Sequence, residues 1–403
     1  MAGLVSLRIA IQADTRRVNM KKNPLRVLAA AAMVLAGISY VAGIYSIDLS
    51  DKNASQRDFI SYWAAGQQLA HGANPYDLEA VSRLERAVGR EDKQPFLIMR
   101  NPPIAFFLAL PLGMVSPKTG LILWLLALLA CLSVSVWILW LLFGRPNNRY
   151  HLLGYVFAPA LACLMAGQFG IFLLLGVALF LYLQHSRPFL AGASLLLCAS
   201  KPHLFLPCAA VLLAWALNQK AYRILAGLFT ALLASCALTF CFDIQAWPQY
   251  IHMMRTGGAL HEPVPALSVA LRFLIDGNAV WLQFLPQTVA CVWALEYFWK
   301  RRNRWSWIEH GLLLLPVSAM CTPFGWLTDE TIVFPAVLYG IYCAVESNRS
   351  LLPLSLIAGI ALIELFAGVQ LVSQYYLWTT PAWLGWYLYA TGGENMGAKN
   401  LRA

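Results

Sequence analysis

Five polar side chains stand at the edges of long apolar stretches. Asp58 lies in "RDFISYW", Gln168 in "GQFG", Lys201 and His203 in "SKPH", and Asp329 in "PFGWLTDE". A carboxylate can accept the proton of an attacking hydroxyl group, and lysine and histidine can stabilise negative charge on a leaving group. These residue types therefore fit a transfer reaction in which one oxygen loses a proton while another gains negative charge.

Each position also has a structural explanation. Asp58 precedes a predicted helix, where a carboxylate can cap the helix or interact with its dipole. Lys201 stands near a predicted helix end, from which its ammonium can reach the membrane interface at little cost. Several such sites on one predicted face nevertheless favour a cavity open to the outer side, with a carboxylate from the first loop and cations from later helix breaks.

The elements that must position these residues are membrane helices. Of the 403 residues, 60% are hydrophobic and only 12% are charged, and the mean hydropathy is +0.61, well above soluble domains. Long runs lack Asp, Glu, Lys and Arg: 27–47, 119–144, 150–186, 202–219, 224–242, 279–295, 311–328, 331–345 and 365–393. These runs are continuous rather than alternating, which argues against a barrel. We expect an all-α polytopic membrane protein with about 10–13 transmembrane helices.

Basic residues between the apolar runs set the expected topology, because cytoplasmic loops are rich in Lys and Arg. Residues 1–26 form a basic cytoplasmic N-terminus, of which 1–19 are either an unstructured extension or precede the natural start at Met20, and 27–47 form the first transmembrane helix. The clusters at 184–188, 218–223, 300–305 and 346–350 are then cytoplasmic, and 48–100, 200–203, 243–277 and 321–330 lie outside. Residues 101–393 form the multi-helix domain and 394–403 a tail, and the topology of 101–167 stays open. This enrichment of Lys and Arg in cytoplasmic loops also accounts for the net charge of +10. We therefore expect no nucleic-acid partner.

The first outer loop concentrates acidic residues and carries eight of the 19 in the chain. Within it, Phe59, Trp63, Ala64 and Leu69 recur at helical spacing, which predicts an amphipathic helix at the membrane surface. His71 and Gly72 end this helix and "NPYD" turns the chain. We expect this loop to form the lid and floor of an outer site, with Phe59, Tyr62 and Trp63 at the interface or against a substrate.

Other classes of site find little support. The nine cysteines form no CxxC pair and their number is odd, so we expect neither a disulfide framework nor a metal cluster. No glycine-rich phosphate loop follows a predicted strand, and no segment is large enough for a nucleotide-binding domain. No cofactor is expected, and a requirement for a divalent metal ion stays open.

The order of five short blocks resembles glycosyltransferase family 87, which belongs to the glycosyltransferase-C superfamily. The blocks, within about residues 25–345, are "DFISYWAAGQQLAHGANPYD", "NPPIAFFLALPLG", "GQFGIFLLLGVALFLYL", "RPFLAGASLLLCASKPHLFLP" and "TPFGWLTDETIVFPAVL". The resemblance implies a glycosyltransferase-C-like bundle that moves a sugar, mannose in the best-known members, from a polyprenyl-phosphate carrier. The acceptor would be an envelope lipid or glycan at the outer face of the plasma (inner) membrane.

The resemblance also carries over individual residues. Asp58 matches the catalytic base, and Lys201 matches the lysine of a Lys-Pro-Gln pattern in which His203 replaces the glutamine. Asp329 matches the end of a later block. Together with the chemistry of the residues, this gives Asp58 as the catalytic base, a donor-phosphate set and a substrate-binding set. The phosphate set is Lys201, His203, Arg57 and Arg255, and the substrate set is Tyr62, Trp63, Gln168 and Asp329, with no metal ligand.

Three alternatives stay open at this stage. A lipid or glycan transporter or flippase would also have many helices and buried charges, although no internal repeat is evident. A transferase for arabinofuranosyl, glucosyl or galactosyl groups would share the same motifs. A scaffold that has lost activity would keep the helices alone.

Overall fold

The computed structural model describes residues 54–91, 97–257, 264–366 and 373–392. Throughout these ranges the regular structure is helical and no strand occurs, which agrees with the all-α prediction. The predicted cytoplasmic N-terminus, the first transmembrane helix at 27–47 and the tail at 394–403 lie outside the described residues.

The α-helices keep short connections over most of the chain. They are α4 (Phe59–Ala70), α5 (Leu78–Ala87), α6 (Phe106–Gly113), α7 (Pro117–Leu142), α8 (Ala158–Ala166), α9 (Gly170–Leu183), α10 (Pro188–Ala199), α11 (Leu206–Asn218), α12 (Tyr222–Phe242), α13 (Ala246–Thr256), α14 (Leu267–Ile275), α15 (Leu285–Arg301), α16 (Leu314–Cys321), α17 (Phe334–Glu346), α18 (Leu352–Phe366) and α19 (Thr379–Thr391). Short 3-10 helices join them: η1 (Pro103–Ala105), η2 (Tyr150–Val156), η3 (Pro202–Leu204), η5 (Val280–Gln283), η6 (Arg302–Arg304), η7 (Gly311–Leu313), η8 (Leu327–Val333) and η9 (Ser373–Trp378).

Two of the described helices, α7 with 26 residues and α12 with 21, are long and apolar enough to cross a membrane. Ser116 starts α7 by accepting a hydrogen bond from the Thr119 backbone N–H at 3.3 Å, and Pro117 follows at the first helical position, where proline is favoured. Large apolar side chains such as Trp137 (56% exposed) and Phe229 (62% exposed) point away from the protein, as expected for lipid contact. Seven further apolar helices are shorter, so the expected 10–13 spans remain a prediction.

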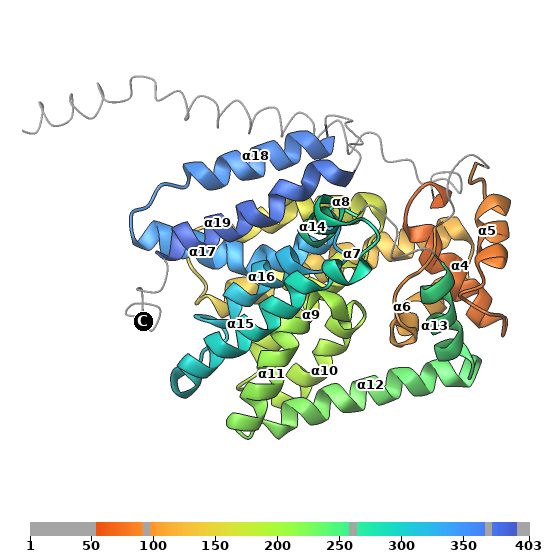
Figure 1. Cartoon of the computed structure of the whole chain (residues 1–403), viewed down its shortest axis with the longest axis horizontal. Helices are drawn as coiled ribbons and strands as arrows, with labels where there is room; N and C mark the ends of the chain where they lie inside the picture. The colour runs from red at the N-terminus through yellow and green to blue at the C-terminus, as the bar shows by residue number, and fades with distance from the viewer. Residues whose placement is uncertain (1–53, 92–96, 258–263, 367–372, 393–403) are drawn as a thin grey trace, which may run out of the picture.

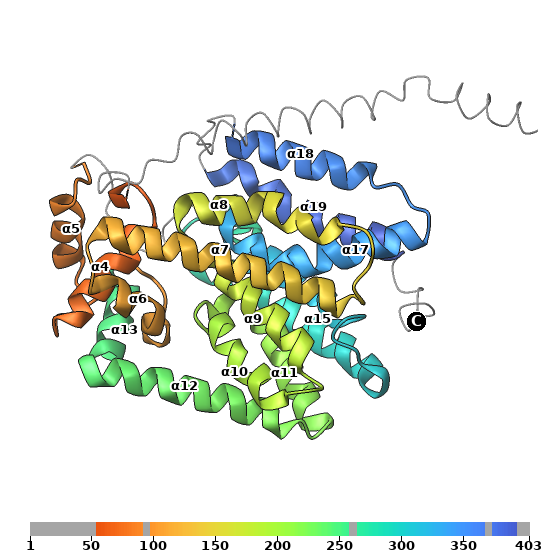
Figure 2. The same cartoon turned by 180° about the vertical axis from the view of Figure 1, so that it is seen from behind.

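The helices are arranged in groups that Figures 1 and 2 show from opposite sides. Helices α4, α5, α6 and α13 gather at one end of the molecule, and α12 runs along one edge. Helices α17, α18 and α19 lie along the opposite edge, with α9, α10 and α11 between the two. Helix α7 starts beside α4 and packs against α9, so it links the end group to the centre.

Helix α4, predicted as an amphipathic surface helix, is instead enclosed by the fold. It packs on α6 through Gly66 and Gly113, where an added Cβ atom would meet the backbone of the facing helix. Small residues allow this close approach of two helices. Nine of the 12 residues of α4 are buried, because α6 and α7 pack against the apolar face that was predicted to lie on the membrane.

Candidate active site

Asp58 lies at the start of α4, yet its side chain does not cap that helix. Its Oδ2 atom accepts a hydrogen bond from Nε2 of Gln168 at 2.8 Å. The backbone of Asp58 is also held in place, because Ser61 Oγ donates a hydrogen bond to the Asp58 carbonyl oxygen at 2.8 Å. The carboxylate is therefore turned away from α4 toward the segment between α8 and α9.

Gln168 is held by a second bond on its other side. Tyr62 Oη donates to Gln168 Oε1 at 2.6 Å, so Tyr62, Gln168 and Asp58 form a chain of two hydrogen bonds. The residue before it, Gly167, has a φ of +70°, which glycine adopts without strain. The Gly167 carbonyl oxygen accepts a bond from Trp124 Nε1 at 2.7 Å, and this fixes the turn that presents Gln168.

Lys201 and Asp329 form a second pair on segments far apart in sequence. Lys201 Nζ lies 2.7 Å from Asp329 Oδ1, and the two side chains are only 12% and 4% exposed. The other oxygen of Asp329 accepts a bond from the Trp326 backbone N–H at 3.2 Å. Helix α9 contacts η8, the element that carries Asp329, and Gly170 permits this contact because a Cβ atom there would meet the Thr328 carbonyl.

The two pairs share one electrostatic environment. Burial is the largest influence on Asp58 and raises the pKa of its carboxyl above the ordinary value. The Gln168 bond and the positive charges of Lys201 and Arg90 lower that pKa, and the negative charge of Asp329 raises it. Lys201 and Asp329 thus lie close enough to Asp58 to influence the pKa of its carboxyl. We refer to Asp58, Tyr62, Gln168, Lys201 and Asp329 as the Asp58 cluster.

The remaining predicted site residues have other contacts. Arg57 Nη1 donates to the Met165 carbonyl at 2.6 Å, and this bond anchors the segment before α4 to α8. The His203 ring faces Phe324 with ring centres 5.9 Å apart, while its backbone carbonyl accepts a bond from Gln287.

Trp63 and Arg255 lie apart from the bonds of the Asp58 cluster. Trp63 is 6% exposed, and its Nε1 atom donates to the Val115 carbonyl at 2.9 Å. This bond holds the connection between α6 and α7. The sequence had predicted that Trp63 contacts substrate, and the structure gives its Nε1 atom this structural partner instead. Arg255 is exposed on α13.

Two sets of buried contacts that support the Asp58 cluster escaped the sequence analysis. Glu85 is completely buried and accepts bonds from the Leu97 backbone N–H at 3.0 and 3.2 Å. Arg90 lies 3.5 Å from Glu85 and donates to the Ser55 carbonyl at 2.8 Å. These bonds tie α5 to the segment that leads into Asp58, and burial raises the pKa of Glu85 to about 7. Helical spacing could have predicted the burial of Glu85, because Glu85 lies one turn after the buried Val81 on the same face of α5.

Asn101 is the second missed contact and supports the lysine. Its Nδ2 atom donates to the Ser200 carbonyl at 2.9 Å, directly before Lys201. Tyr76 Oη in turn donates to the Asn101 carbonyl at 2.8 Å. The "NPP" turn at the start of η1 therefore connects the first loop with the break between α10 and α11.

The Asp58 cluster combines a proton acceptor with a fixed cation. A carboxylate whose pKa is raised by burial is a stronger base than an exposed one, and the ammonium of Lys201 can attract an anionic group. Among the residues that the structure describes, no three His, Cys, Asp or Glu side chains gather as a metal site would require.

The family model of glycosyltransferase family 87 matches residues 100–323, more than half of the chain. Gln168 and Lys201 fall within the matched segment, whereas Asp58 and Asp329 lie outside it. No curated protein and no solved structure matches the chain.

Proposed function

Because the chain belongs to glycosyltransferase family 87 and is a membrane glycosyltransferase, we propose that it transfers a hexose from a polyprenyl-phosphate carrier. By resemblance to the family the hexose is mannose, and the acceptor is an envelope lipid or glycan at the outer face of the inner membrane. One observation carries this proposal: the Asp58 carboxylate, held by Gln168, lies in the field of the buried pair of Lys201 and Asp329.

In the proposed reaction an acceptor hydroxyl oxygen attacks the anomeric carbon of the sugar. The bond from that carbon to the phosphate oxygen breaks, and its electron pair stays on the phosphate. The hydroxyl proton passes to the Asp58 carboxylate. Attack from the face opposite the phosphate inverts the configuration at the anomeric carbon.

Asp58 suits the role of base because its surroundings hold the carboxylate in one orientation and raise its pKa. Gln168 fixes one oxygen at 2.8 Å, which leaves the other available for the acceptor hydroxyl. The burial that raises the pKa of Asp58 brings its proton affinity nearer to that of a base working close to neutral pH. The bond from Tyr62 to Gln168 limits rotation of the amide that holds the carboxylate.

Lys201 suits the role of phosphate contact. The leaving phosphate becomes a monoester dianion or monoanion, which is already a weak base, so the reaction needs no general acid. It needs positive charge held in place before the reaction begins. The bond to Asp329 uses one of the three ammonium protons of Lys201, which leaves protons for a phosphate oxygen and fixes the direction of the side chain.

A donor panel tests the proposal. The purified full-length protein in lipid nanodiscs is incubated with an acceptor lipid extract and one radiolabelled polyprenyl-phosphate hexose at a time, with a nucleotide sugar as a parallel donor. We expect label to move from polyprenyl-phosphate mannose to a lipid or glycan product with inverted configuration. Transfer from the nucleotide sugar alone, or retention of configuration, contradicts the proposal.

A further inference from the structure

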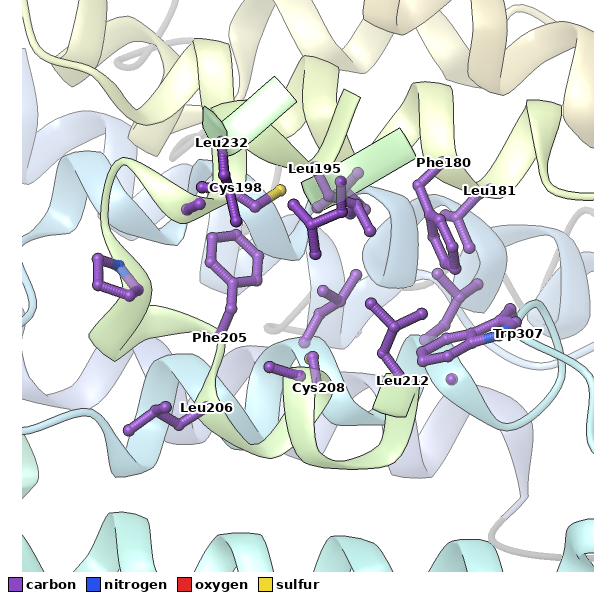
Figure 3. Close-up of a pocket in the computed structure, with 18 residues that line it drawn as sticks. Phe180, Leu181, Leu195, Cys198, Phe205, Leu206, Cys208, Leu212, Leu232 and Trp307 are labelled. Carbon is purple, nitrogen blue, oxygen red and sulfur yellow. The ribbon is translucent and has the colours of Figure 1, made fainter. Parts of the chain in front are cut away.

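An apolar cavity of about 200 Å³ lies between α9, α10, α11 and α12 (Figure 3). The labelled side chains extend from Leu206 at one end to Trp307 at the other. Apart from Pro202 and Gly311 the lining is aliphatic, aromatic or thiol, as in Phe180, Leu195, Cys198, Phe205, Leu212 and Trp307.

The cavity is too large to be ordinary imperfect packing. Protein interiors are packed to crystal density, with few voids larger than a water molecule. An apolar void does not hold water well, and an engineered cavity of about 150 Å³ lined by similar side chains stays dry and binds benzene. By that comparison this cavity accommodates about five to ten carbon atoms of an apolar ligand.

The position of the cavity connects it to the Asp58 cluster. Ala199 and Pro202 line the cavity, and Lys201 stands between them in the chain with its ammonium directed to Asp329. One short turn therefore provides both the apolar wall and the cation.

The cavity also has an apolar opening. Leu206 at its rim is 44% exposed, and Leu233 on the neighbouring surface of α12 is 53% exposed. A chain longer than the cavity can leave across these side chains into surrounding lipid without contact with water.

Resting on the proposed function, we propose that this cavity binds the hydrocarbon segment next to the phosphate of the lipid-linked donor. The bound segment is a prenyl chain, whose remainder runs out past Leu206. Burial of this segment helps to orient the donor, so that its phosphate stays at Lys201 while the acceptor approaches Asp58. The donor is then recognised by its carrier as well as by its sugar.

A matched pair of variants on α11 tests this site. Leu212 lines the cavity and is 9% exposed, whereas the adjacent Leu213 is 53% exposed. Leu212→Trp fills the cavity, and Leu213→Trp adds the same side chain on the lipid side. Ala209→Phe, at an exposed lining position, narrows the opening without adding to the buried core.

The binding measurement is the shift in Tm of the full-length protein on addition of decaprenyl phosphate, hexadecyl phosphate or inorganic phosphate. We expect decaprenyl phosphate to raise the Tm of the wild type and of Leu213→Trp, with a smaller rise in Leu212→Trp and Ala209→Phe. Inorganic phosphate, which can contact Lys201 but has no prenyl chain, should give a smaller rise than decaprenyl phosphate. An equal response of all variants overturns the site, and a rise with hexadecyl phosphate that matches or exceeds the prenyl effect assigns the cavity to acyl chains and overturns it as well.

The kinetic measurement separates failure of the site from failure of the proposed function. For a donor with a long carrier, KM should rise about tenfold in Leu212→Trp, which corresponds to the loss of about two buried methylene groups. For a donor with a carrier truncated to two isoprene units, KM should rise less. If no polyprenyl-phosphate sugar is used but the Tm response depends on Leu212, the proposed reaction fails and the site stands. Normal transfer with an unchanged KM in Leu212→Trp contradicts the proposed cavity site and leaves the proposed reaction standing.

Discussion

Replacing Gln168 with leucine tests how the carboxylate of Asp58 is held. Leucine keeps the approximate size of the side chain but removes the Nε2–H that donates to Asp58 Oδ2 at 2.8 Å. That bond stabilises the charged form of the carboxyl group, and its loss therefore raises the pKa of Asp58 further. Because the base must be unprotonated, the acidic limb of the pH profile should move to higher pH.

The magnitude follows from the kind of bond that is lost. A hydrogen bond to a charged group contributes about 1.5–3 kcal/mol, and Asp58 is half-buried, so the lower half of that range applies. One pKa unit corresponds to about 1.4 kcal/mol, and we expect the limb of kcat/KM to move by about one unit. Tyr62→Phe removes only the neutral bond to Gln168 Oε1, and its limb should move less.

The assay measures kcat/KM for the radiolabelled donor at a series of pH values in nanodiscs. Gln184→Leu serves as the control, because Gln184 is also buried and donates only to the Leu181 carbonyl at the other end of α9. Its profile should match the wild type. A limb that stays in place or moves to lower pH in Gln168→Leu refutes the assignment of Gln168 as the donor that stabilises the base.

Two further predictions concern buried charges near the site. Lys201→Gln leaves the Asp329 carboxylate buried without its cation, so the free energy of unfolding should fall by about 3–5 kcal/mol in a denaturant titration. The double variant Lys201→Gln/Asp329→Asn should recover stability but not transfer, and recovered transfer would place the phosphate contact elsewhere. Burial raises the pKa of Glu85 from 4.5 to about 7, so the folded protein favours the protonated form and its stability should fall as pH rises between those values. Glu85→Gln should flatten this dependence of Tm on pH, and a wild-type Tm that rises across the window contradicts the assignment.

The sequence predicted the class of fold because the relevant signal is local. Continuous apolar runs require helices in a membrane, and the described part of the chain is helical. The order of short motifs indicated glycosyltransferase family 87, and the family model confirms it. Hydropathy alone did not fix the number of spans, because seven of the apolar helices in the described part of the chain have only 10–17 residues, fewer than a full crossing needs.

The pairing of side chains across the site could not be read from the chain. Lys201 and Asp329 were each conspicuous at an apolar boundary, but they are 128 residues apart and nothing local joins them. Glu85 appeared as one of many acidic residues in an outer loop, and its burial becomes evident only once α5 is packed. Trp63 appeared suited to a sugar, yet its bond to Val115 depends on the approach of the α6–α7 connection.

The environment of α4, the helix after Asp58, also could not be predicted from the sequence. A spacing of apolar residues by three and four is shared by helices on a membrane surface and by helices enclosed in a fold. Helix α4 is enclosed, because Gly66 and Gly113 let α6 approach its backbone. Glycines at a helix crossing are the sequence feature that distinguishes these two cases here.

The most direct test of the central claim compares Asp58→Asn with Asp77→Asn in single-turnover transfer from the polyprenyl-phosphate donor. Asp77 belongs to the same loop and caps α5 by accepting bonds from the Glu79 and Ala80 backbone N–H groups, each at 3.0 Å, a role that asparagine can also fill. Asp58→Asn should slow transfer by about 10²–10⁴-fold with an unchanged Tm, while Asp77→Asn transfers at the wild-type rate. Transfer by Asp58→Asn at the wild-type rate would contradict a role for Asp58 as the base.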